Sequence, residues 1–387
     1  MVDIDRDAVL ERFLRYVKVW TTSDKNVPCT PSTSGQWDLA KMLVHELSGL
    51  GIDDITLTGQ CCVIARIPAA TTKPAETIGF LAHLDTSEET SGKDVQPLVQ
   101  QNAEGKTIIT SGGDTLLGAD DKAGIAEIVS AAEYLLRHPE VEHGPIELIF
   151  TPDEETGKPP EHLPRNEIRS TCCFTVDGGG EGEIEIECFN AYSVTVTFFG
   201  RVMHPGYARG ALVNAALMAA VFAAMLPRTE SPEATDGYYG YYSVTGISGG
   251  GENAVVELIL RDFEKSGIER RLAALEQFAR AVEAQFPGGT VSVQPKESYH
   301  NMRPCIEARP EILTRIAAAA QRAGVAWRLK PVRGGTDGAR LCEMGIPTPN
   351  MWTGGHNFHS RDEWACLEEM TSACRMIVEL SRCSSEI

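Results

Sequence analysis

Apolar residues follow two spacings along the chain, and the alternation between them predicts a mixed α/β fold. Helical spacing recurs near residues 9–17, 37–50 and 122–137. Short uninterrupted apolar runs indicate buried strands, and they fall at residues 62–67, 78–82, 146–150 and 172–176. Buried strands that alternate with helices are typical of a largely parallel sheet flanked by helices.

The order of elements changes between about residues 189 and 300. There the sequence predicts strand, helix, two strands, helix and strand, which is the split βαβ pattern of an α+β domain. After about residue 301 helices and strands alternate again. We therefore expect one domain built from residues 1–188 and 301–387, with a second domain at 189–300 inserted into it.

Composition and charge argue against some classes of binding partner. The 35 basic and 54 acidic residues give a net charge of −19, which repels nucleic acid and anionic membrane surfaces. The longest apolar run, 215–226, falls short of the ~20 residues of a membrane span. The amino terminus, with Asp3, Asp5 and Asp7, does not resemble a secretory signal, so we expect a cytoplasmic protein.

Other motifs do not point to a second chemistry. The 11 cysteines have no C-x-x-C spacing, and we expect buried free thiols. Residues 246–250 match G-x-S-x-G, but a strand pattern follows at 252–260, which favours a hairpin over the strand-to-helix turn of a serine hydrolase. No phosphate-binding loop and no H-E-x-x-H sequence occur.

Polar residues with metal-binding or acid–base side chains follow each buried strand. In a parallel sheet, ligands bind beyond the carboxyl ends of the strands, so we consider these residues as one candidate site. They are His83 and Asp85, Asp120 and Asp121, Asp153, Glu154 and Glu155, Asp177, and, after a late apolar run, His356 and His359. Singly, each has an ordinary explanation, such as a helix N-cap, a surface acid or a core histidine. Together, so many carboxylates would repel one another strongly unless cations neutralised them.

The donor set and its charge predict a centre with two metal ions. Oxygen and nitrogen donors without thiolates suit zinc, and cobalt or manganese would accept the same donors. Three carboxylate ligands and one hydroxide would balance two divalent cations, which leaves one carboxylate as a base. Two such ions about 3.5–4 Å apart lower the pKa of a water toward 7 and polarise a carbonyl group, which suits amide hydrolysis.

The ordered motifs resemble the peptidase T branch of the dinuclear zinc exopeptidases, a superfamily that also includes carboxypeptidase G and aminoacylase relatives. Nine segments carry the resemblance: GFLAHLDTSEE (79–89), TLLGADDKAGIAEI (115–128), IFTPDEETG (149–157), FTVDGGGEGEIE (174–185), MHPGYARG (203–210), LRDF (260–263), YHNMR (299–303), RGGTDGARL (333–341) and TGGHNFHSRDEW (353–364). The resemblance implies an α/β zinc exopeptidase fold whose inserted α+β domain serves as a lid. It also implies that two divalent ions, Zn2+ foremost, assist the release of the first residue of short peptides, tripeptides above all.

The resemblance further implies a role for each strand-end residue. Asp120 would bridge the two metal ions. One ion would take His83 and Asp177 as further ligands, and the other would take Glu155 and His359.

The remaining carboxylates would assist the reaction. Glu154 is left as the general base, which would take a proton from the attacking water and deliver it to the leaving amine. Asp85 would accept the other N–H of the His83 imidazole and fix its tautomer. A cis peptide bond after Asp120 is a further implication of the resemblance.

Several residues would contact the substrate. His204 resembles a lid histidine that stabilises the oxyanion, and a turn histidine before Pro205 is the alternative. Arg261, Asn301, Arg303 and Arg333 resemble substrate-binding residues, since the guanidinium groups among them bind a peptide carboxylate well. Each of these could instead be a surface residue in an ion pair. His356 could compete with His359 as a ligand, but we interpret it as a pocket-wall residue.

Two other functions stay open at this point. The same scaffold can serve another exopeptidase or an N-acyl amino acid deacylase, because pocket residues set the substrate. A non-catalytic metal-dependent binding protein would lack the base, yet Glu154 is present. We therefore predict a metallo-aminopeptidase for short peptides, and the resemblance leaves room for a homodimer formed through the inserted domain.

Overall fold

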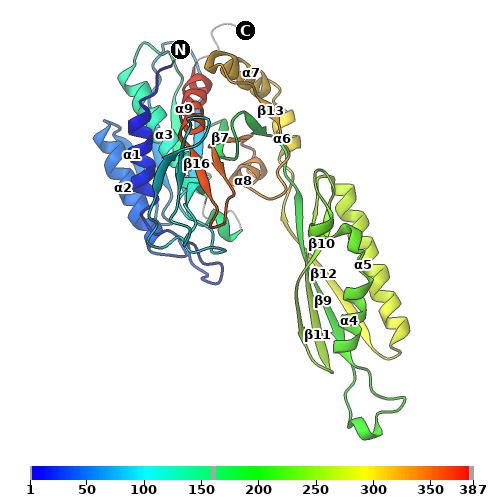
Figure 1. Ribbon diagram of the computed structural model, residues 1–387. Coiled ribbons are helices and arrows are strands. Elements are labelled where there is room, and N and C mark those ends of the chain that lie inside the picture. The colour runs from blue at the N-terminus through cyan, green and yellow to red at the C-terminus, as the bar shows by residue number, and fades with distance from the viewer. Residues whose placement is uncertain (1, 158–162, 383–387) are drawn as a thin grey trace. The chain divides into compact units, whose positions relative to one another are not determined.

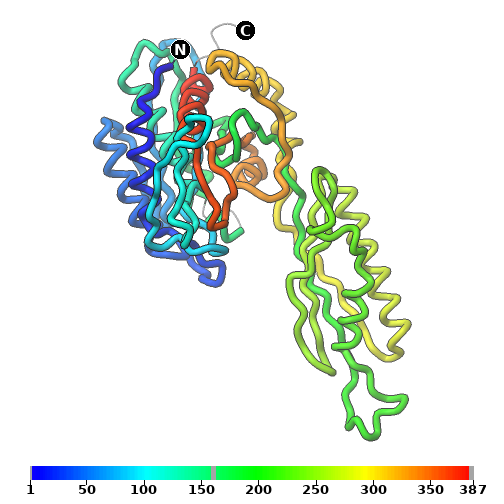
Figure 2. The backbone as a smooth tube through the Cα atoms, in the orientation of Figure 1, coloured from blue at the N-terminus to red at the C-terminus, as the bar shows by residue number. Residues whose placement is uncertain are grey.

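The computed structural model describes residues 2–157 and 163–382, and the chain forms two compact units (Figure 1). Unit 1 comprises Met1–Ile186, Met302–Lys330 and Thr336–Ile387, and unit 2 comprises Glu187–Asn301 and Pro331–Gly335. The chain therefore leaves unit 1, builds most of unit 2 and returns, as the colours of Figure 2 show. The role of the inserted unit as a lid stays a prediction.

Unit 1 is built around an eight-stranded mixed sheet with the order β1-β2-β6-β3-β7-β14-β8-β13. Its strands are β1 (Asp54–Leu57), β2 (Val63–Ile67), β6 (Ile146–Thr151), β3 (Ile78–His83), β7 (Cys172–Gly178), β14 (Asn350–Trp352), β8 (Glu183–Glu185) and β13 (Arg328–Leu329). The central neighbours β6, β3, β7 and β14 are parallel to one another. Every residue of β3 and β6 is buried, because both faces of the sheet are covered. The predicted mixed, largely parallel sheet is therefore confirmed.

Helices flank this sheet (Figure 1). They are α1 (Arg6–Tyr16), α2 (Gly35–Gly49), α3 (Ala119–Arg137), α6 (Arg303–Glu307), α7 (Glu311–Ala323), α8 (Asp337–Glu343) and α9 (Leu367–Ser381). α3 packs against β3 and β7, and also against α1 and α9. Gly124 allows α3 to approach β7 closely, since a Cβ at this position would lie 1.9 Å from the carbonyl oxygen of Val176. This close packing places the first turn of α3 beside the carboxyl end of β7.

A second, four-stranded sheet in unit 1 was not predicted. It is antiparallel and consists of β15 (Gly355–His356), β16 (Trp364–Cys366), β5 (Thr107–Thr110) and β4 (Leu98–Gln101). Such short strands lack a long apolar run, so their pattern does not stand out from that of loops. The sheet matters for function because the turn between β15 and β16 carries His359.

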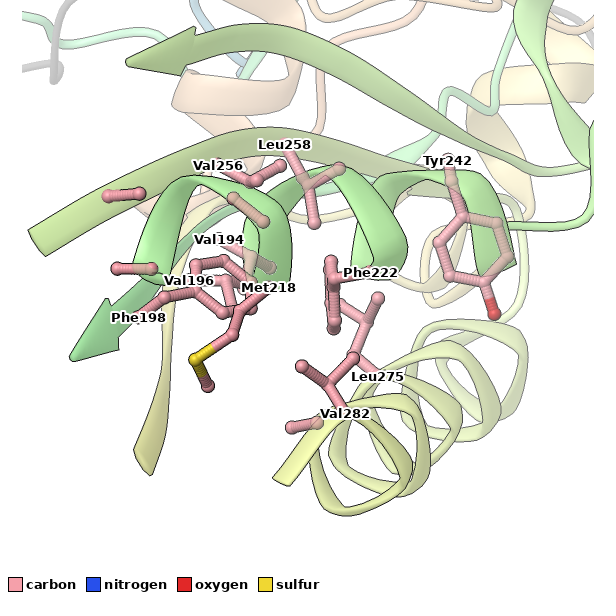
Figure 3. Packing of buried hydrophobic residues seen from close by; sticks show 14 of the residues in the cluster. Val194, Val196, Phe198, Met218, Phe222, Tyr242, Val256, Leu258, Leu275 and Val282 are labelled. Atoms are coloured by element: carbon pink, nitrogen blue, oxygen red, sulfur yellow. The ribbon is translucent and has the colours of Figure 1, made fainter. Parts of the chain in front are cut away.

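Unit 2 contains an antiparallel sheet of order β10-β11-β9-β12 and two long helices. Its elements are β9 (Asn190–Phe199), α4 (Ala215–Met225), β10 (Tyr241–Gly249), β11 (Asn253–Asp262), α5 (Lys265–Gln285) and β12 (Thr290–Tyr299), which is the predicted order. Phe198, Phe222 and Leu275 lie in a core of its own (Figure 3). Ser248 of the G-x-S-x-G sequence lies in β10 and pairs with Val255 of β11, so this sequence belongs to a hairpin.

Two further findings bear on the sequence analysis. Within residues 2–157 and 163–382, no helix combines the length and the apolar character that crossing a membrane requires. The cysteines of the same residues are free thiols, and most of them are buried.

Candidate metal centre

Five segments of unit 1 bring carboxylate and imidazole groups to the carboxyl ends of the central strands. β3 ends at His83, β7 carries Asp177, and β6 leads into a short 3-10 turn, η1 (Glu154–Thr156). Asp120 lies in the first turn of α3 with non-helical dihedral angles, and the peptide bond that follows it is cis. His359 comes from the turn between β15 and β16.

Two groups of side chains in the described part of the chain could each hold a metal ion, and both contain Asp120. The first group is His83, Asp120 and Asp177, and the second is Asp120, Glu155 and His359. His83 Nε2 lies 2.7 Å from Asp120 Oδ1 and 3.6 Å from Asp177 Oδ1. His359 Nε2 lies 3.2 Å from Asp120 Oδ2 and 2.9 Å from Glu155 Oε1. The two oxygens of Asp120 thus face different histidines, as those of a bridging carboxylate would.

Burial and neighbouring charges shift the pKa values of these groups. Burial alone would lower the pKa of His83, but Asp177 and Asp120 raise it well above its usual value. Hydrogen bonds to Asp120 and Glu155 raise the pKa of His359 to about 11. Burial raises the pKa values of Asp177 and Glu155, and the charge of Asp120 raises them further. For Asp120 itself, the hydrogen bonds from the two histidines outweigh burial and lower its pKa. The site therefore favours positive charge between its carboxylates.

The donor set fits two divalent cations. Imidazole nitrogens and carboxylate oxygens are donors that zinc, cobalt and manganese accept. In both histidines Nε2 faces the carboxylates, and Nδ1 has a separate partner. His83 Nδ1 lies 3.0 Å from the main-chain oxygen of Asp85, and His359 Nδ1 lies 3.3 Å from Glu89 Oε2. A partner on the second ring nitrogen is typical of histidines that bind metals.

Asp85 holds the turn that carries Glu154 and Glu155. Its Oδ1 accepts the main-chain N–H of Glu154 at 3.0 Å, and its Oδ2 accepts that of Glu155 at 3.2 Å. Asp85 Oδ1 also lies 3.4 Å from His83 Nδ1, and the main-chain oxygen of Asp85 lies nearer, at 3.0 Å. The expected role of the Asp85 carboxylate in fixing the His83 tautomer stays a prediction.

Glu154 lies outside both groups of candidate ligands. Burial raises the pKa of its carboxyl group well above the usual value, and the negative charge of Asp177 raises it further. A carboxyl group with a raised pKa accepts a proton more readily at neutral pH, which suits a general base.

Three further side chains hold the main chain at the ligands, and of these the sequence analysis named only Asp121. Asp121 Oδ2 accepts the N–H of His83 at 3.0 Å, and Asn350 Oδ1 accepts that of Asp177 at 3.2 Å. Glu363 accepts three main-chain N–H groups before and at the start of α3. These contacts join segments that are far apart in the chain, so no spacing pattern could reveal them.

The predicted substrate residues are divided between the units. His204, Arg261, Asn301 and Arg333 belong to unit 2, and Arg303 belongs to unit 1. His204 is exposed and accepts the N–H of Gly206. The other three residues of unit 2 donate to main-chain oxygens within that unit, and Arg303 pairs with Glu307 at 2.7 Å. Roles in substrate binding stay predictions for all five residues.

His356 joins neither group of candidate ligands. Its Nε2 lies 3.0 Å from Glu369 Oε2, and its ring stacks on Trp364 with the centroids 4.0 Å apart. This geometry does not support His356 as a competing ligand. Its role as a pocket-wall residue stays a prediction.

Comparisons with known proteins agree with this site. The sequence profile described as Peptidase family M20/M25/M40 matches residues 79–382. Peptidase T of Geobacillus thermodenitrificans is 41% identical over 401 residues, which cover 97% of this chain and 98% of that protein. Peptidase T of Clostridium perfringens (strain 13 / Type A) is also 41% identical, over 98% of this chain and 99% of that protein.

Solved structures show the same fold. The aminopeptidase PepT from Bacillus cereus has a TM-score of 0.80 at 23% identity, with 98% of each chain covered. A dinuclear metal-binding peptidase of the M20 family from Bacillus subtilis has a TM-score of 0.70 at 16% identity, with 97% of each chain covered. The chain therefore belongs to peptidase family M20/M25/M40 and, within it, to the group of the peptidases T.

Proposed function

We propose that this protein is a metallo-aminopeptidase that releases the N-terminal residue of short peptides, with tripeptides as its preferred substrates. The observation that carries the proposal is the pair of side-chain groups that share Asp120, because it offers places for two divalent cations in one site. Two such cations would lower the pKa of a water and polarise the carbonyl group of the scissile bond. Membership of the peptidase family and the peptidase T relatives support the reaction class.

The chain's own residues would move the proton and hold the substrate. Glu154 takes a proton from the attacking water and delivers it to the leaving amine. Asp85 keeps Glu154 in place through the hydrogen bond to its main-chain N–H. His204 stabilises the oxyanion. Arg261, Asn301, Arg303 and Arg333 contact the substrate, and the guanidinium groups among them suit its carboxylate end.

Three finer statements belong to the same proposal. Zinc is the native metal, since the donor set of imidazole and carboxylate suits it. The protein works in the cytoplasm, and unit 2 offers the surface for a homodimer. Metal analysis and the mass of the purified protein in solution test the first and the last of these.

A substrate screen tests the proposed reaction. The metal-loaded protein is incubated with Ala-Ala-Ala, Ala-Ala, a longer alanine peptide and N-acetylalanine, and free alanine is measured. We expect the tripeptide to be cleaved fastest, with loss of activity on chelation and recovery on addition of Zn2+. Faster cleavage of N-acetylalanine would favour a deacylase. Inactivity of the metal-loaded protein on every substrate would favour a binding protein.

A further inference from the structure

Glu363 connects two segments that carry candidate metal ligands. Its side chain is 1% exposed and lies in unit 1. Oε2 accepts the main-chain N–H groups of Leu117 and Gly118 at 2.6 and 2.8 Å, and Oε1 accepts that of Asp120 at 3.1 Å. One carboxylate therefore binds three donors in the segment that leads into α3.

The start of α3 has no side-chain cap of its own. Gly118, the residue before α3, has φ +84° and no side chain, so the helix start lacks the usual capping hydrogen bond. Asp120 itself has φ −84° and ψ 104°, outside the helical region. The position of Asp120 thus depends on a partner from elsewhere in the chain, and Glu363 is that partner.

The main chain of Glu363 lies in the turn that carries His359. The main-chain N–H of Glu363 donates to the oxygen of Ser360 at 3.3 Å, and the Ser360 hydroxyl donates to the oxygen of Asn357 at 2.7 Å. His359 and Asn357 both have positive φ angles, 61° and 56°, which residues other than glycine rarely adopt. Such a turn persists only where the surrounding structure holds it.

We propose that Glu363 is a positioning residue that fixes Asp120 and His359 relative to each other, so that the second group of ligands can bind its cation. The inference rests on the proposed function, because it assigns a cation to the group of Asp120, Glu155 and His359. His359 takes part in this group alone. Loss of the connection should therefore weaken one of the two cation sites more than the other.

Glu147 provides a matched control. It is also a fully buried glutamate of unit 1, and its carboxylate also accepts two main-chain N–H groups, those of Arg169 and Ser170 at 2.8 and 2.7 Å. It lies near the start of β6, away from η1, which follows the end of that strand. Glu147 Oε1 also pairs with Arg66 Nε at 2.9 Å, so Glu147→Gln should cost at least comparable stability without touching the candidate ligands.

The test is a titration of the metal-free full chain with Co2+, followed by visible absorption and by calorimetry. We expect two Co2+ ions per chain for the unmodified protein and for Glu147→Gln. In Glu363→Gln the amide group faces main-chain donors, so the ion of the second group should bind about 10–100-fold more weakly. The other ion, which shares Asp120 but not His359, should lose less affinity. Glu363→Asp, which keeps the charge on a shorter side chain, should give a smaller loss and carries the test if Glu363→Gln does not fold.

The possible outcomes distinguish failure of the proposed function from failure of the positioning role of Glu363. If the unmodified protein binds fewer than two Co2+ ions, the proposed function loses its metal centre, and the role of Glu363 is rejected with it. If the unmodified protein binds two ions and the Glu363 variants bind both with unchanged affinity, only the positioning role is rejected. Equal weakening in the Glu363 and Glu147 variants would also reject it, because the effect would then follow from stability alone.

Discussion

Glu127 is a carboxyl group in α3 that the proposed reaction does not use. It is fully buried, and neither of its oxygens has a hydrogen-bond partner among the described residues. Burial, together with the negative charge of Asp121, raises its pKa well above the usual value. The folded protein therefore holds this proton more tightly than the unfolded protein does. In consequence, the free energy of unfolding should fall as the pH rises above about 4.5 toward the raised pKa.

Glu127→Gln should remove this dependence. At about pH 8 we expect the variant to be more stable than the unmodified protein by about 1–3 kcal/mol, because a glutamine has no proton that the unfolded chain could release. The difference should shrink toward about pH 5. Denaturant unfolding at several pH values measures it, with the exposed Glu104→Gln as the control. Parallel stability curves for the two proteins would contradict the prediction.

The proposed base can be separated from the candidate ligands by a pair of variants. Glu154→Gln should lower kcat on Ala-Ala-Ala by about 10²–10⁴-fold, because the amide cannot accept the proton, while the metal content stays unchanged. Glu155→Gln should lower the metal content itself. Atomic absorption and steady-state kinetics on the two purified variants measure both effects. Activity of Glu154→Gln close to that of the unmodified protein would rule out its role as the base.

At the scale of elements, the approach of α3 to β7 sets the distance between the candidate ligands. Gly124→Ala would place a methyl group 1.9 Å from the carbonyl oxygen of Val176, the residue before Asp177. We expect a loss of about 1–3 kcal/mol in the free energy of unfolding, since close-packed backbone must move apart. The control is Gly49→Ala near the end of α2, where a Cβ meets no atom within 4 Å. Equal stability of the two variants would contradict this reading of the interface.

The elements also show what the sequence could and could not predict. The second helix predicted for residues 189–300 is found as α5 (Lys265–Gln285), because its apolar face has a clear period over many residues. Among the strands predicted after about residue 301, β13 (Arg328–Leu329) is only two residues long, and it is an edge strand whose residues are exposed. Edge strands bury little apolar surface, so their length is not encoded in a hydrophobic pattern.

For the site, the rule that ligands gather at strand ends pointed to the residues that the structure brings together. It could not point to residues that act on the main chain of distant segments. Asn350 and Glu363 are examples, because each accepts N–H groups from a segment far away in sequence. Contacts between distant segments depend on how the whole sheet packs. They cannot be predicted from the local pattern of a single sequence.

For the whole molecule, the two units have separate cores, and the candidate metal centre belongs to unit 1 alone. A ligand that binds only the folded state stabilises it, by about 4 kcal/mol at a free concentration 1,000 times its Kd. Removing the cations also restores the repulsion between the carboxylates of the centre. Chelation should therefore lower the stability of unit 1 and leave that of unit 2 nearly unchanged.

Scanning calorimetry of the full chain, with and without chelator, measures the effect of the cations on the stability of each unit. We expect two transitions, of which one moves to lower temperature on chelation and returns when Zn2+ is added. The other should stay in place. If both transitions moved together, the units would unfold as one cooperative body and the assignment of the effect to unit 1 would be wrong.

Because unit 2 interrupts unit 1 in the sequence, the candidate ligands are synthesised at different times. Four of the five candidate ligands lie before unit 2 in the chain, whereas His359 lies after it. A ribosome adds about 5–20 residues per second, so the nascent chain carries an incomplete centre throughout the synthesis of unit 2. Hydrolytic capacity thus arises only near the end of translation, when the last ligand has emerged and joined the others.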